Sequence, residues 1–595
     1  MAGRRYAPIR DYAVIGDGRT VALVARDGRI DWLCLPNLDS PSVFAALLDA
    51  GRGGYFELRP DLPFDAQRRY LPGSNVLETT FVTAGGTVRV TDAMTLPGVG
   101  LSPVRELARR IEGLAGRVPL RWRVEPRFGY ASAATRFVSR GAWAVAVNGG
   151  DALAICAWDA GRPTLEEGAI AGGVDIADGG RAMLALVSAH GEPLVFPPRG
   201  DVEARLDATT AFWDDWSARL RYAGSWRAPV LRAALALKLL VFAQSGAIAA
   251  AATTSLPEGI GGERNWDYRY CWIRDSSFTL EALLQLGCHA EATSFFWWFM
   301  HATRLTLPRL QVFYRLDGGA YAPERTLPLE GYRGSRPVRI GNGAAGQVQL
   351  DTYGELLDTA FVYVGKGYPL DTSTGRDLAR VADFVCEHWR DPDAGIWEIR
   401  AAPRHHTQSK AMCWVALDRA VRLADAGHLP RARAPRWRAE AAAIRRFVDT
   451  QCWSTAKGSY VGYAGGEDLD ASLLLMAIRR YDEPESPRLR GTVEAIRREL
   501  SRGPLLYRYT GDDGLAGGEG AFLCCSFWLA EALAIAGRRD EAARLMDDLI
   551  GLANDVGLYA EEIEPAGGEF LGNFPQGLVH LALVSAAVAL APTAS

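Results

Sequence analysis

Two glutamates in separate segments combine with their neighbours in a way that suits acid–base chemistry. Glu398 directly follows Trp397 in the segment 395–420, and Glu561 begins a run of glutamates in the segment 559–580. Hydrolysis of a glycoside with inversion needs two carboxyl groups about 6.5–9.5 Å apart, so that a water molecule fits between one of them and the sugar carbon. Glu398 and Glu561 are the candidates for such a pair.

The residues next to Glu398 in the sequence favour a role for Glu398 as the general acid. An acid must keep its proton near neutral pH, and burial among apolar side chains raises the pKa of a carboxyl group because it disfavours the charged form. Trp397 and Ile396 supply such surroundings. The alternative is a glutamate exposed on a loop. The segment 559–580 has an alternative too, because acidic residues near helix starts often only complement the helix dipole, and the contribution of Glu562 is left open.

The segment 265–275, NWDYRYCWIRD, has the composition of a sugar-binding pocket. It holds four aromatic residues, two arginines and two aspartates in eleven positions. The rings alternate with charged residues, so an extended backbone places several of them on one side. They are Trp266, Tyr268, Tyr270 and Trp272. Arg274 and Asp275 supply a cation and a carboxylate for sugar hydroxyls, whereas the alternatives are a surface charge and a helix N-cap.

Residues 10 to about 190 carry the pattern of an all-β domain. Short runs of β-branched and apolar residues alternate with Gly, Asp and Pro, and strands are predicted near residues 20, 29, 54, 75, 87, 120, 142 and 183. We therefore expect an antiparallel β-sandwich over residues 1–200. A helical linker is predicted over 201–227, with Phe212, Trp213 and Trp216 docked between the two halves.

From residue 228 to residue 595 the apolar period becomes helical. Twelve helices are predicted, at 228–247, 275–288, 289–305, 351–365, 374–389, 409–426, 435–450, 468–481, 488–501, 521–536, 539–553 and 575–591. Six antiparallel hairpins of helices close into an (α/α)6 barrel, which is the expected catalytic domain. The motifs lie just before the second, sixth, tenth and twelfth helices. If the even-numbered helices form the inner ring, the motifs meet in one pocket at one mouth of the barrel.

The composition argues against several partners. With 66 basic and 70 acidic side chains the formal charge is −4, which is unlike the charge of a nucleic-acid-binding protein. No apolar run approaches the roughly 18 residues that span a bilayer, so no membrane partner is expected. The nine cysteines are scattered without CxxC spacing, and the N-terminus lacks the apolar stretch of a secretory signal. These features predict reduced thiols in a cytoplasmic protein.

No cofactor and no metal site is predicted. His405 and His406 are adjacent rather than at the helical spacing of metal ligands, and no HExxH motif occurs, so ordinary loop histidines are expected. The glycine-rich GIGGE at 259–263 has neither a predicted strand before it nor a phosphate-binding fingerprint, so a turn is expected there. The oligomeric state is left open.

Together these segments resemble glycoside hydrolase family 15, the inverting glucoamylases, trehalases and related exo-α-glucosidases. The opening YAVIGDGRTVALVARDGRIDWLCLPNLDSPSVFAALLD is similar to the β-domain of bacterial members. Resemblance to their catalytic domain runs through RNWDYRYCWIRD, GIWEIR, SKAMCWVALDRA, EGAFLCCSFWLAEAL and LGNFPQGLVH. The resemblance therefore covers nearly the whole chain, with several long motifs in the family's order.

The resemblance implies a role for each matching residue. Glu398 matches the general acid, and Glu561 matches the general base that activates water. Tyr268 matches a tyrosine that helps to hold this water. The residues assigned to substrate binding, besides Tyr268, are Trp272, Arg274, Asp275, Trp397, Lys410, Arg508 and Glu519.

Two positions depart from the fungal glucoamylase pattern. Ile399 stands where those enzymes have a second glutamate after the acid, and Ala521 stands where they have a tryptophan near the leaving sugar. We therefore expect an enzyme that releases β-glucose from small neutral glucosides, either trehalose or short α-1,4- or α-1,6-linked oligosaccharides. The alternatives are a glucoamylase acting on starch or maltodextrin, a glycoside phosphorylase and a non-catalytic sugar-binding protein.

Overall fold

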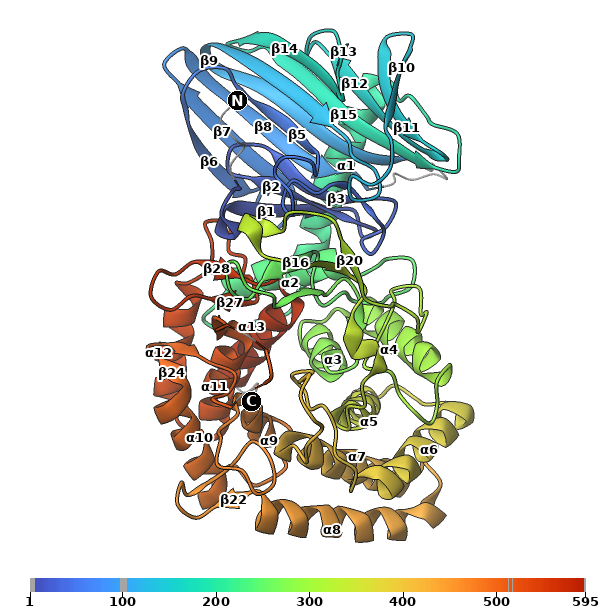
Figure 1. The fold of residues 1–595 in the computed structure, drawn as a ribbon, viewed down its shortest axis with the longest axis vertical. Helices are drawn as coiled ribbons and strands as arrows, with labels where there is room; N and C mark the ends of the chain where they lie inside the picture. The colour runs from blue at the N-terminus through green and yellow to red at the C-terminus, as the bar shows by residue number, and fades with distance from the viewer. Residues whose placement is uncertain (1–5, 97–103, 512, 516, 593–595) are drawn as a thin grey trace.

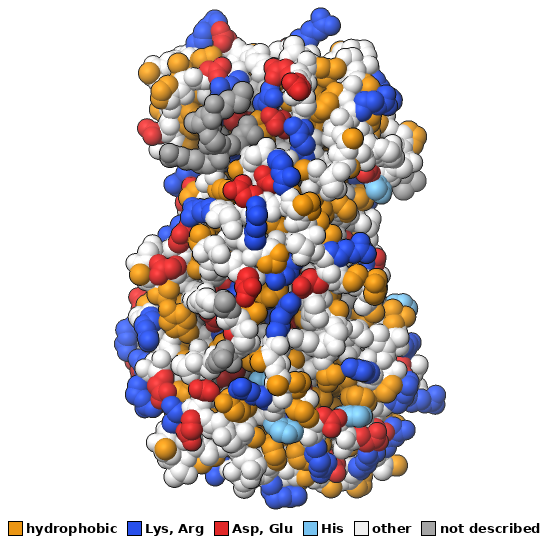
Figure 2. Space-filling model, in the orientation of Figure 1, with side chains coloured by type: hydrophobic (Ala, Val, Ile, Leu, Met, Phe, Trp, Pro, Cys, Tyr) orange, Lys and Arg blue, Asp and Glu red, His pale blue; other side chains and the backbone are white. Residues whose placement is uncertain are grey.

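The computed structural model describes residues 6–96, 104–511, 513–515 and 517–592, which form two lobes (Figure 1). Strands make up the N-terminal lobe, and helices make up the C-terminal lobe. Basic and acidic side chains are interspersed over the visible face, which agrees with the near balance of charge (Figure 2). None of the described helices combines the length and the apolar character that crossing a membrane requires.

The N-terminal lobe is an antiparallel β-sandwich, as predicted. Its longest strand, β9 (Arg105–Glu125), belongs to both layers. The first half of β9 pairs with β8 and β15, and the second half pairs with β5 and β14. Apolar side chains of both layers fill the space between them. The other strands are β1 (Tyr12–Gly16), β2 (Val21–Ala25), β3 (Ile30–Cys34), β4 (Ser42–Phe44), β5 (Tyr55–Pro60), β6 (Phe64–Tyr70), β7 (Leu77–Thr83), β8 (Gly86–Met94), β10 (Arg136–Arg140), β11 (Trp143–Asn148), β12 (Asp151–Trp158), β13 (Thr164–Glu166), β14 (Ala169–Ala177) and β15 (Arg181–His190).

Helix α1 (Arg199–Ala218) joins the two lobes. It contacts the sandwich where the Leu96 amide donates to Thr209 Oγ1 at 2.8 Å. It contacts the helical lobe where Trp216 Nε1 donates to Glu291 Oε1 at 2.8 Å. Trp213 and Trp216 are buried as expected, but Phe212 is 39% exposed because it lies on the outer side of the helix. Docking of Phe212 was therefore predicted wrongly.

The helical lobe is an (α/α)6 barrel, as predicted. Twelve α-helices follow α1 in the described part of the chain, and the even members of this series, α3, α5, α7, α9, α11 and α13, contact one another in a closed inner ring. Only α9 is much shorter than predicted, because the 3-10 turn η5 (Ala471–Leu474) replaces its start. The helices are α2 (Arg227–Leu240), α3 (Ser276–Gln285), α4 (His289–Arg304), α5 (Asp351–Gly365), α6 (Thr372–His388), α7 (Thr407–Asp425), α8 (Ala434–Gln451), α9 (Leu475–Ile478), α10 (Pro487–Leu500), α11 (Leu523–Ile535), α12 (Arg539–Ile550) and α13 (Gly577–Leu590).

A buried arginine ties the barrel to the sandwich. Arg269 forms a two-pronged ion pair with Asp267, at 2.7 and 2.8 Å, and its Nη1 donates to the Ser40 carbonyl at 2.9 Å. Nearby, Trp32 Nε1 donates to the Ala252 carbonyl at 3.0 Å. Ser40 and Trp32 belong to the sandwich, so the sandwich fixes the segment 265–275 that enters the barrel mouth.

The inner ring also buries a carboxyl group whose ionisation opposes folding. Burial and the nearby Glu281 raise the pKa of Glu531 to about 7, although Ser585 donates to its Oε1 at 3.0 Å. In the unfolded chain a glutamate has a pKa of about 4.3. As the pH rises from about 4.3 to about 7, Glu531 therefore loses its proton in the unfolded state but keeps it in the folded state, and the free energy of unfolding falls.

We therefore expect Glu531→Gln to raise Tm by roughly 1–3 °C at pH 8 and to have no such effect at pH 4.5, because the amide does not ionise. Calorimetric scans of both proteins at the two pH values measure this difference. A gain of equal size at both pH values would contradict the assignment.

Candidate active site

Segments far apart in the chain meet at the barrel end where the inner helices begin. They line a narrow cavity, in which the centres of water-sized spheres can occupy about 30 Å³. The contributing segments precede α3, α5, α7 and α11, and the strand pair β16 (Thr254–Pro257) and β17 (Asn265–Asp267) adds a further wall. Four of the residues proposed from sequence line this cavity, namely Tyr268, Trp397, Glu398 and Arg508.

Glu398 is held in a defined orientation beside the cavity. Its side chain is 12% exposed, so the alternative of an exposed loop glutamate does not apply. Its Oε1 accepts hydrogen bonds from Trp272 Nε1 at 2.6 Å and from Arg274 Nη1 at 3.3 Å. Oε2 is left for a substrate. Burial raises the pKa of Glu398, and the positive charge of Arg274 opposes this rise in part.

The backbone of Glu398 is strained. Its φ of +59° lies in the left-handed region, which costs a non-glycine residue about 1–2 kcal/mol. The Glu398 amide donates to the Gly395 carbonyl at 3.2 Å, and Gln347 Nε2 donates to the Glu398 carbonyl at 3.1 Å. These contacts hold the conformation that turns the carboxyl group toward Trp272.

Glu561 is almost completely enclosed, with 1% of its surface exposed. Its Oε2 accepts a hydrogen bond from the Asn573 amide at 3.1 Å. Gly572 packs so closely that a Cβ atom there would lie 2.6 Å from Glu561 Oε2, and its φ of +71° also favours glycine. Burial first, and then the charge of Glu258, raise the pKa of Glu561 to about 8, while Arg508 opposes the rise.

The charges of both glutamates act on the same tyrosine. Burial raises the pKa of Tyr268 well above its usual range, and the charges of Glu561 and Glu398 raise it further. The Tyr268 ring meets the Trp272 ring edge to face at 4.9 Å. The four rings of segment 265–275 lie in one apolar cluster, so the alternation in the sequence has the expected result.

Arg274 and Asp275 form a buried pair next to Glu398. Arg274 Nε donates to Asp275 Oδ1 at 2.7 Å, and both side chains are buried. Asp275 stands at the N-cap position of α3, but its side chain accepts no capping hydrogen bond. The surface charge and the cap that were the alternatives for these residues are therefore not observed.

Trp397 is fixed by an aspartate that sequence analysis missed. Its Nε1 donates to Asp470 Oδ1 at 2.9 Å, and the same oxygen caps η5 by accepting from the Ser472 amide at 2.7 Å. The Trp397 ring packs against Phe522 with centroids 5.5 Å apart. Asp470 lies 73 residues after Trp397, and its sequence signal was only that of a helix cap.

Loss of this contact is expected to move Trp397 and thus Glu398. Asp470→Ala should lower kcat by about 10- to 100-fold with a smaller effect on KM, because small displacements of a reacting group are costly. Asp470→Asn keeps the Oδ1 acceptor and should restore most of the rate. Steady-state kinetics of both variants test the effect, and equal losses in the two variants would contradict a positioning role.

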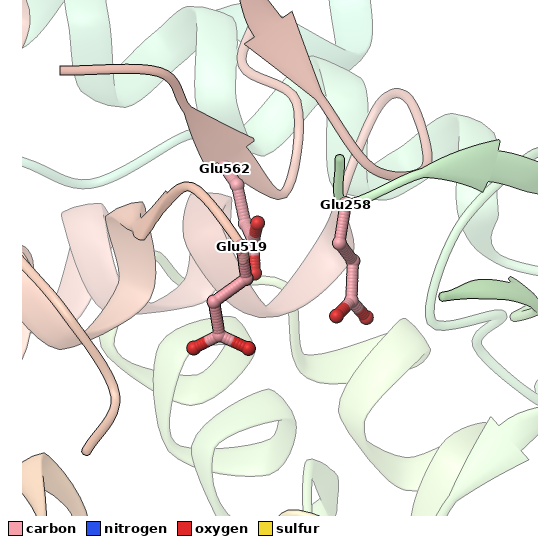
Figure 3. A group of neighbouring side chains, drawn as sticks. All are labelled: Glu258, Glu519 and Glu562. Carbon is pink, nitrogen blue, oxygen red and sulfur yellow. The ribbon is translucent and has the colours of Figure 1, made fainter. Parts of the chain in front are cut away.

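Three glutamates from separate segments lie close together (Figure 3). All three face Arg508. Glu258 Oε2 accepts from Arg508 Nη2 at 2.8 Å, Glu519 Oε1 accepts from Nε at 3.1 Å, and Glu562 Oε1 lies 3.6 Å from Nη2. Oxygens of the three carboxylates lie within 4.8 Å of one another, which is the spacing of a metal site. Because Arg508 already pairs with all three, this donor set fits a guanidinium.

Glu258 was missed by sequence analysis, and the reason is local. It directly follows β16, a strand that was not predicted before the glycine-rich turn at 259–263. Glu519, by contrast, was assigned to the site from sequence and does pair with Arg508.

The other polar residues that sequence analysis singled out lie away from the cavity lining. Lys410 is fully buried, and its Nζ donates to the Asp391 carbonyl at 2.5 Å. His406 is buried, and burial lowers its pKa. Glu564 stabilises a local turn, in which its Oε1 accepts a hydrogen bond from the Ala566 amide at 2.9 Å. Of the proposed residues outside the lining, Trp272 and Arg274 hydrogen-bond to Glu398, Glu519 hydrogen-bonds to Arg508, and Asp275 pairs with Arg274. Glu561 and Lys410 are not among the lining residues.

Comparison with known proteins agrees with this arrangement. A family model described as Glycosyl hydrolases family 15 matches residues 224–588, which is more than half of the chain. The chain belongs to glycoside hydrolase family 15. A second model, described as trehalase-like N-terminal, matches residues 1–156. As a family 15 member the chain is a glycoside hydrolase.

Relatives of this family 15 chain are similar along almost its whole length. The trehalase of Mycobacterium tuberculosis is 39% identical over 619 residues, which cover 98% of this chain and 89% of the relative. The trehalase of Thermoplasma volcanium is 35% identical, with 98% and 93% covered. A bacterial glucoamylase complexed with acarbose has a similar fold, with a TM-score of 0.72, 13% identity, and coverage of 98% of this chain and 94% of that one.

Proposed function

We propose that this family 15 enzyme hydrolyses trehalose and other short α-glucosides with inversion. Two observations support the catalytic assignment: Glu398 lines the cavity together with Tyr268, and the charge of the buried Glu561, from a distant segment, acts on the same tyrosine. Relatives named trehalase that are 39 and 35% identical support the substrate.

In the proposed reaction the terminal glucose binds against Arg274 and Asp275. Glu398 gives the proton on Oε2 to the glycosidic oxygen while its Oε1 stays bonded to Trp272. The bond from the anomeric carbon to this oxygen breaks, and water adds to the carbon from the opposite face. Glu561 takes the proton that the water loses, so the glucose is released as the β anomer.

The raised pKa of Glu561 has a consequence for this reaction. Glu561 accepts a proton only when it is ionised, and Arg508 and Arg274 are the groups that favour its ionised form. The acidic limb of kcat/KM against pH therefore reports the ionisation of Glu561 in the free enzyme. Tyr268, whose pKa is raised, stays protonated beside it and donates a hydrogen bond to the attacking water.

The outer wall of the cavity favours short substrates. The guanidinium groups of Arg400 and Arg339 lie over the Trp266 ring, at 4.1 and 4.4 Å from its centroid. Glu324 pairs with both arginines, at 2.8 and 3.3 Å. Arg400 and Trp266 line the cavity, so this stacked group limits the space beyond Glu398. We infer that this wall favours a leaving group of one sugar over a starch chain.

A substrate panel with anomer detection tests the proposal. Trehalose, maltose, isomaltose and soluble starch are supplied without and with phosphate, and NMR follows the first product. We expect β-glucose first, with trehalose among the best substrates and no need for phosphate. Inverting hydrolysis would be rejected if the α anomer appeared first, or if glucose 1-phosphate formed only with phosphate. The preference for trehalose and short α-glucosides would be rejected if soluble starch were much the best substrate.

A cytoplasmic location completes the proposal. All nine cysteines are buried and none forms a disulfide, as expected for reduced thiols in that compartment. A neutral disaccharide is the only partner that the proposed site requires.

A further inference from the structure

One carboxylate that lines the cavity has no contact with the substrate in the reaction proposed above. Glu258 is 1% exposed, and its Oε2 accepts from Arg508. Its Oε1 is buried and has no hydrogen-bond partner among the residues that the structure describes. A buried acceptor without a partner is costly to the folded protein, so Glu258 Oε1 can gain stability from a donor that enters the cavity.

The position of Glu258 is fixed by its surroundings. Its amide donates to the Arg264 carbonyl at 3.1 Å, and its carbonyl accepts from the Gly520 amide at 3.2 Å. Arg508 is held in turn by Glu519. Figure 3 shows the carboxylates of Glu258 and Glu519 pointing the same way from different segments. The unpartnered oxygen is therefore part of a rigid wall.

Glu258 lines the same cavity as the proposed acid, Glu398. The residues that line it include Glu258 and Glu398 but neither Arg274 nor Asp275, which bind the terminal glucose in the proposed reaction. The stacked Trp266 and Arg400 close its outer part. A substrate that places its terminal glucose against Arg274 therefore extends its leaving sugar, past Glu398, into the space that Glu258 lines.

We propose that Glu258 binds the leaving sugar by accepting a hydrogen bond from one of its hydroxyl groups through Oε1. This inference rests on the proposed function and adds a specificity-determining residue to it. Arg508 fixes the other oxygen, so only one acceptor is presented to the substrate. A hydroxylated leaving group gains this bond, and a leaving group without hydroxyls does not.

Two substrates with the same glucosyl group but different leaving groups distinguish binding of the leaving sugar from a general effect on catalysis. In Glu258→Gln, kcat/KM for trehalose should fall by about 10- to 100-fold, the range for loss of a hydrogen bond to a charged group. For α-glucosyl fluoride, which has no leaving sugar, the fall should be less than about threefold. Each rate is taken at the pH optimum of the variant, so a shifted pKa of Glu561 does not mimic the effect.

Glu562→Gln is the matched control. Glu562 also faces Arg508, at 3.6 Å, but it does not line the cavity. Its variant should change the rates on both substrates by the same factor. If Glu258→Gln also changes both rates equally, or changes neither, the inference is overturned while the proposed function stands. A wild-type enzyme that is inactive on both substrates would instead reject the proposed function, and the inference with it.

A measurement on the wild-type enzyme covers the case of a variant that does not fold. Cyclohexyl α-glucoside has a leaving group with a six-membered ring but no further hydroxyls. We expect kcat/KM for trehalose to exceed that for cyclohexyl α-glucoside by at least about tenfold. Equal values would overturn the proposal.

Discussion

Replacement of Glu561 by glutamine is expected to lower kcat on trehalose by about a thousandfold or more, within the range for loss of a general base. The amide has nearly the size of the carboxylate, so it fits beside Gly572, whose close packing leaves little tolerance for a change of shape. It cannot take a proton from water. Steady-state assays of glucose release, together with circular dichroism to show that the fold is intact, measure the effect.

The same base is required for every leaving group. Glu561→Gln should therefore lose activity on α-glucosyl fluoride to a similar extent. Glu561→Ala opens space for a small nucleophile, and added azide should restore turnover with β-glucosyl azide as product. Glu564→Gln serves as the control, because Glu564 belongs to a local turn of the same segment. A fully active Glu561→Gln enzyme would end the assignment.

Replacement of Glu398 by glutamine is expected to lower kcat/KM on trehalose by roughly a hundred- to ten-thousandfold. Glutamine keeps an oxygen that can accept from Trp272 Nε1, so the left-handed backbone conformation at position 398 should be retained. Its amide N–H is far too weak an acid to transfer a proton to the glycosidic oxygen. Assays with trehalose and α-glucosyl fluoride measure the size of the loss.

The leaving group separates the acid from the base. Fluoride departs without a proton from the enzyme, so Glu398→Gln should hydrolyse α-glucosyl fluoride with a much smaller loss than it shows on trehalose. Glu561→Gln should show no such difference. Equal losses of Glu398→Gln on both substrates would mean that Glu398 acts by binding or positioning.

Most of the fold follows from periodicity in the sequence. The outer helices α6, α10 and α12 each have one buried apolar face and one exposed polar face, so their helical period is clear. Strands β6 and β10 escaped prediction because charged side chains on their exposed faces, as in FDAQRRY and RFVSR, hide the alternation. The start of α9 was misplaced because a short 3-10 turn has no amphipathic period of its own.

The candidate site could be predicted only where its residues stand in recognisable motifs. Trp397 and Glu398 are adjacent, and Arg274 and Asp275 end an aromatic segment. Glu258 and Asp470 could not be found in this way, because their importance comes from contacts with Arg508 and Trp397 that lie 250 and 73 residues away in the chain. Local sequence gives no sign of such pairs.

The hydrogen bond from Arg269 to Ser40 has a consequence for how this protein tolerates change. The acceptor is a main-chain carbonyl, so nearly any side chain at position 40 preserves it. An insertion or deletion between β3 and β4 would instead move the carbonyl away and release the aromatic segment at the barrel mouth. At this contact, exchange of the sandwich for that of another protein should therefore depend on the length of the loop between β3 and β4 rather than on the residue at position 40.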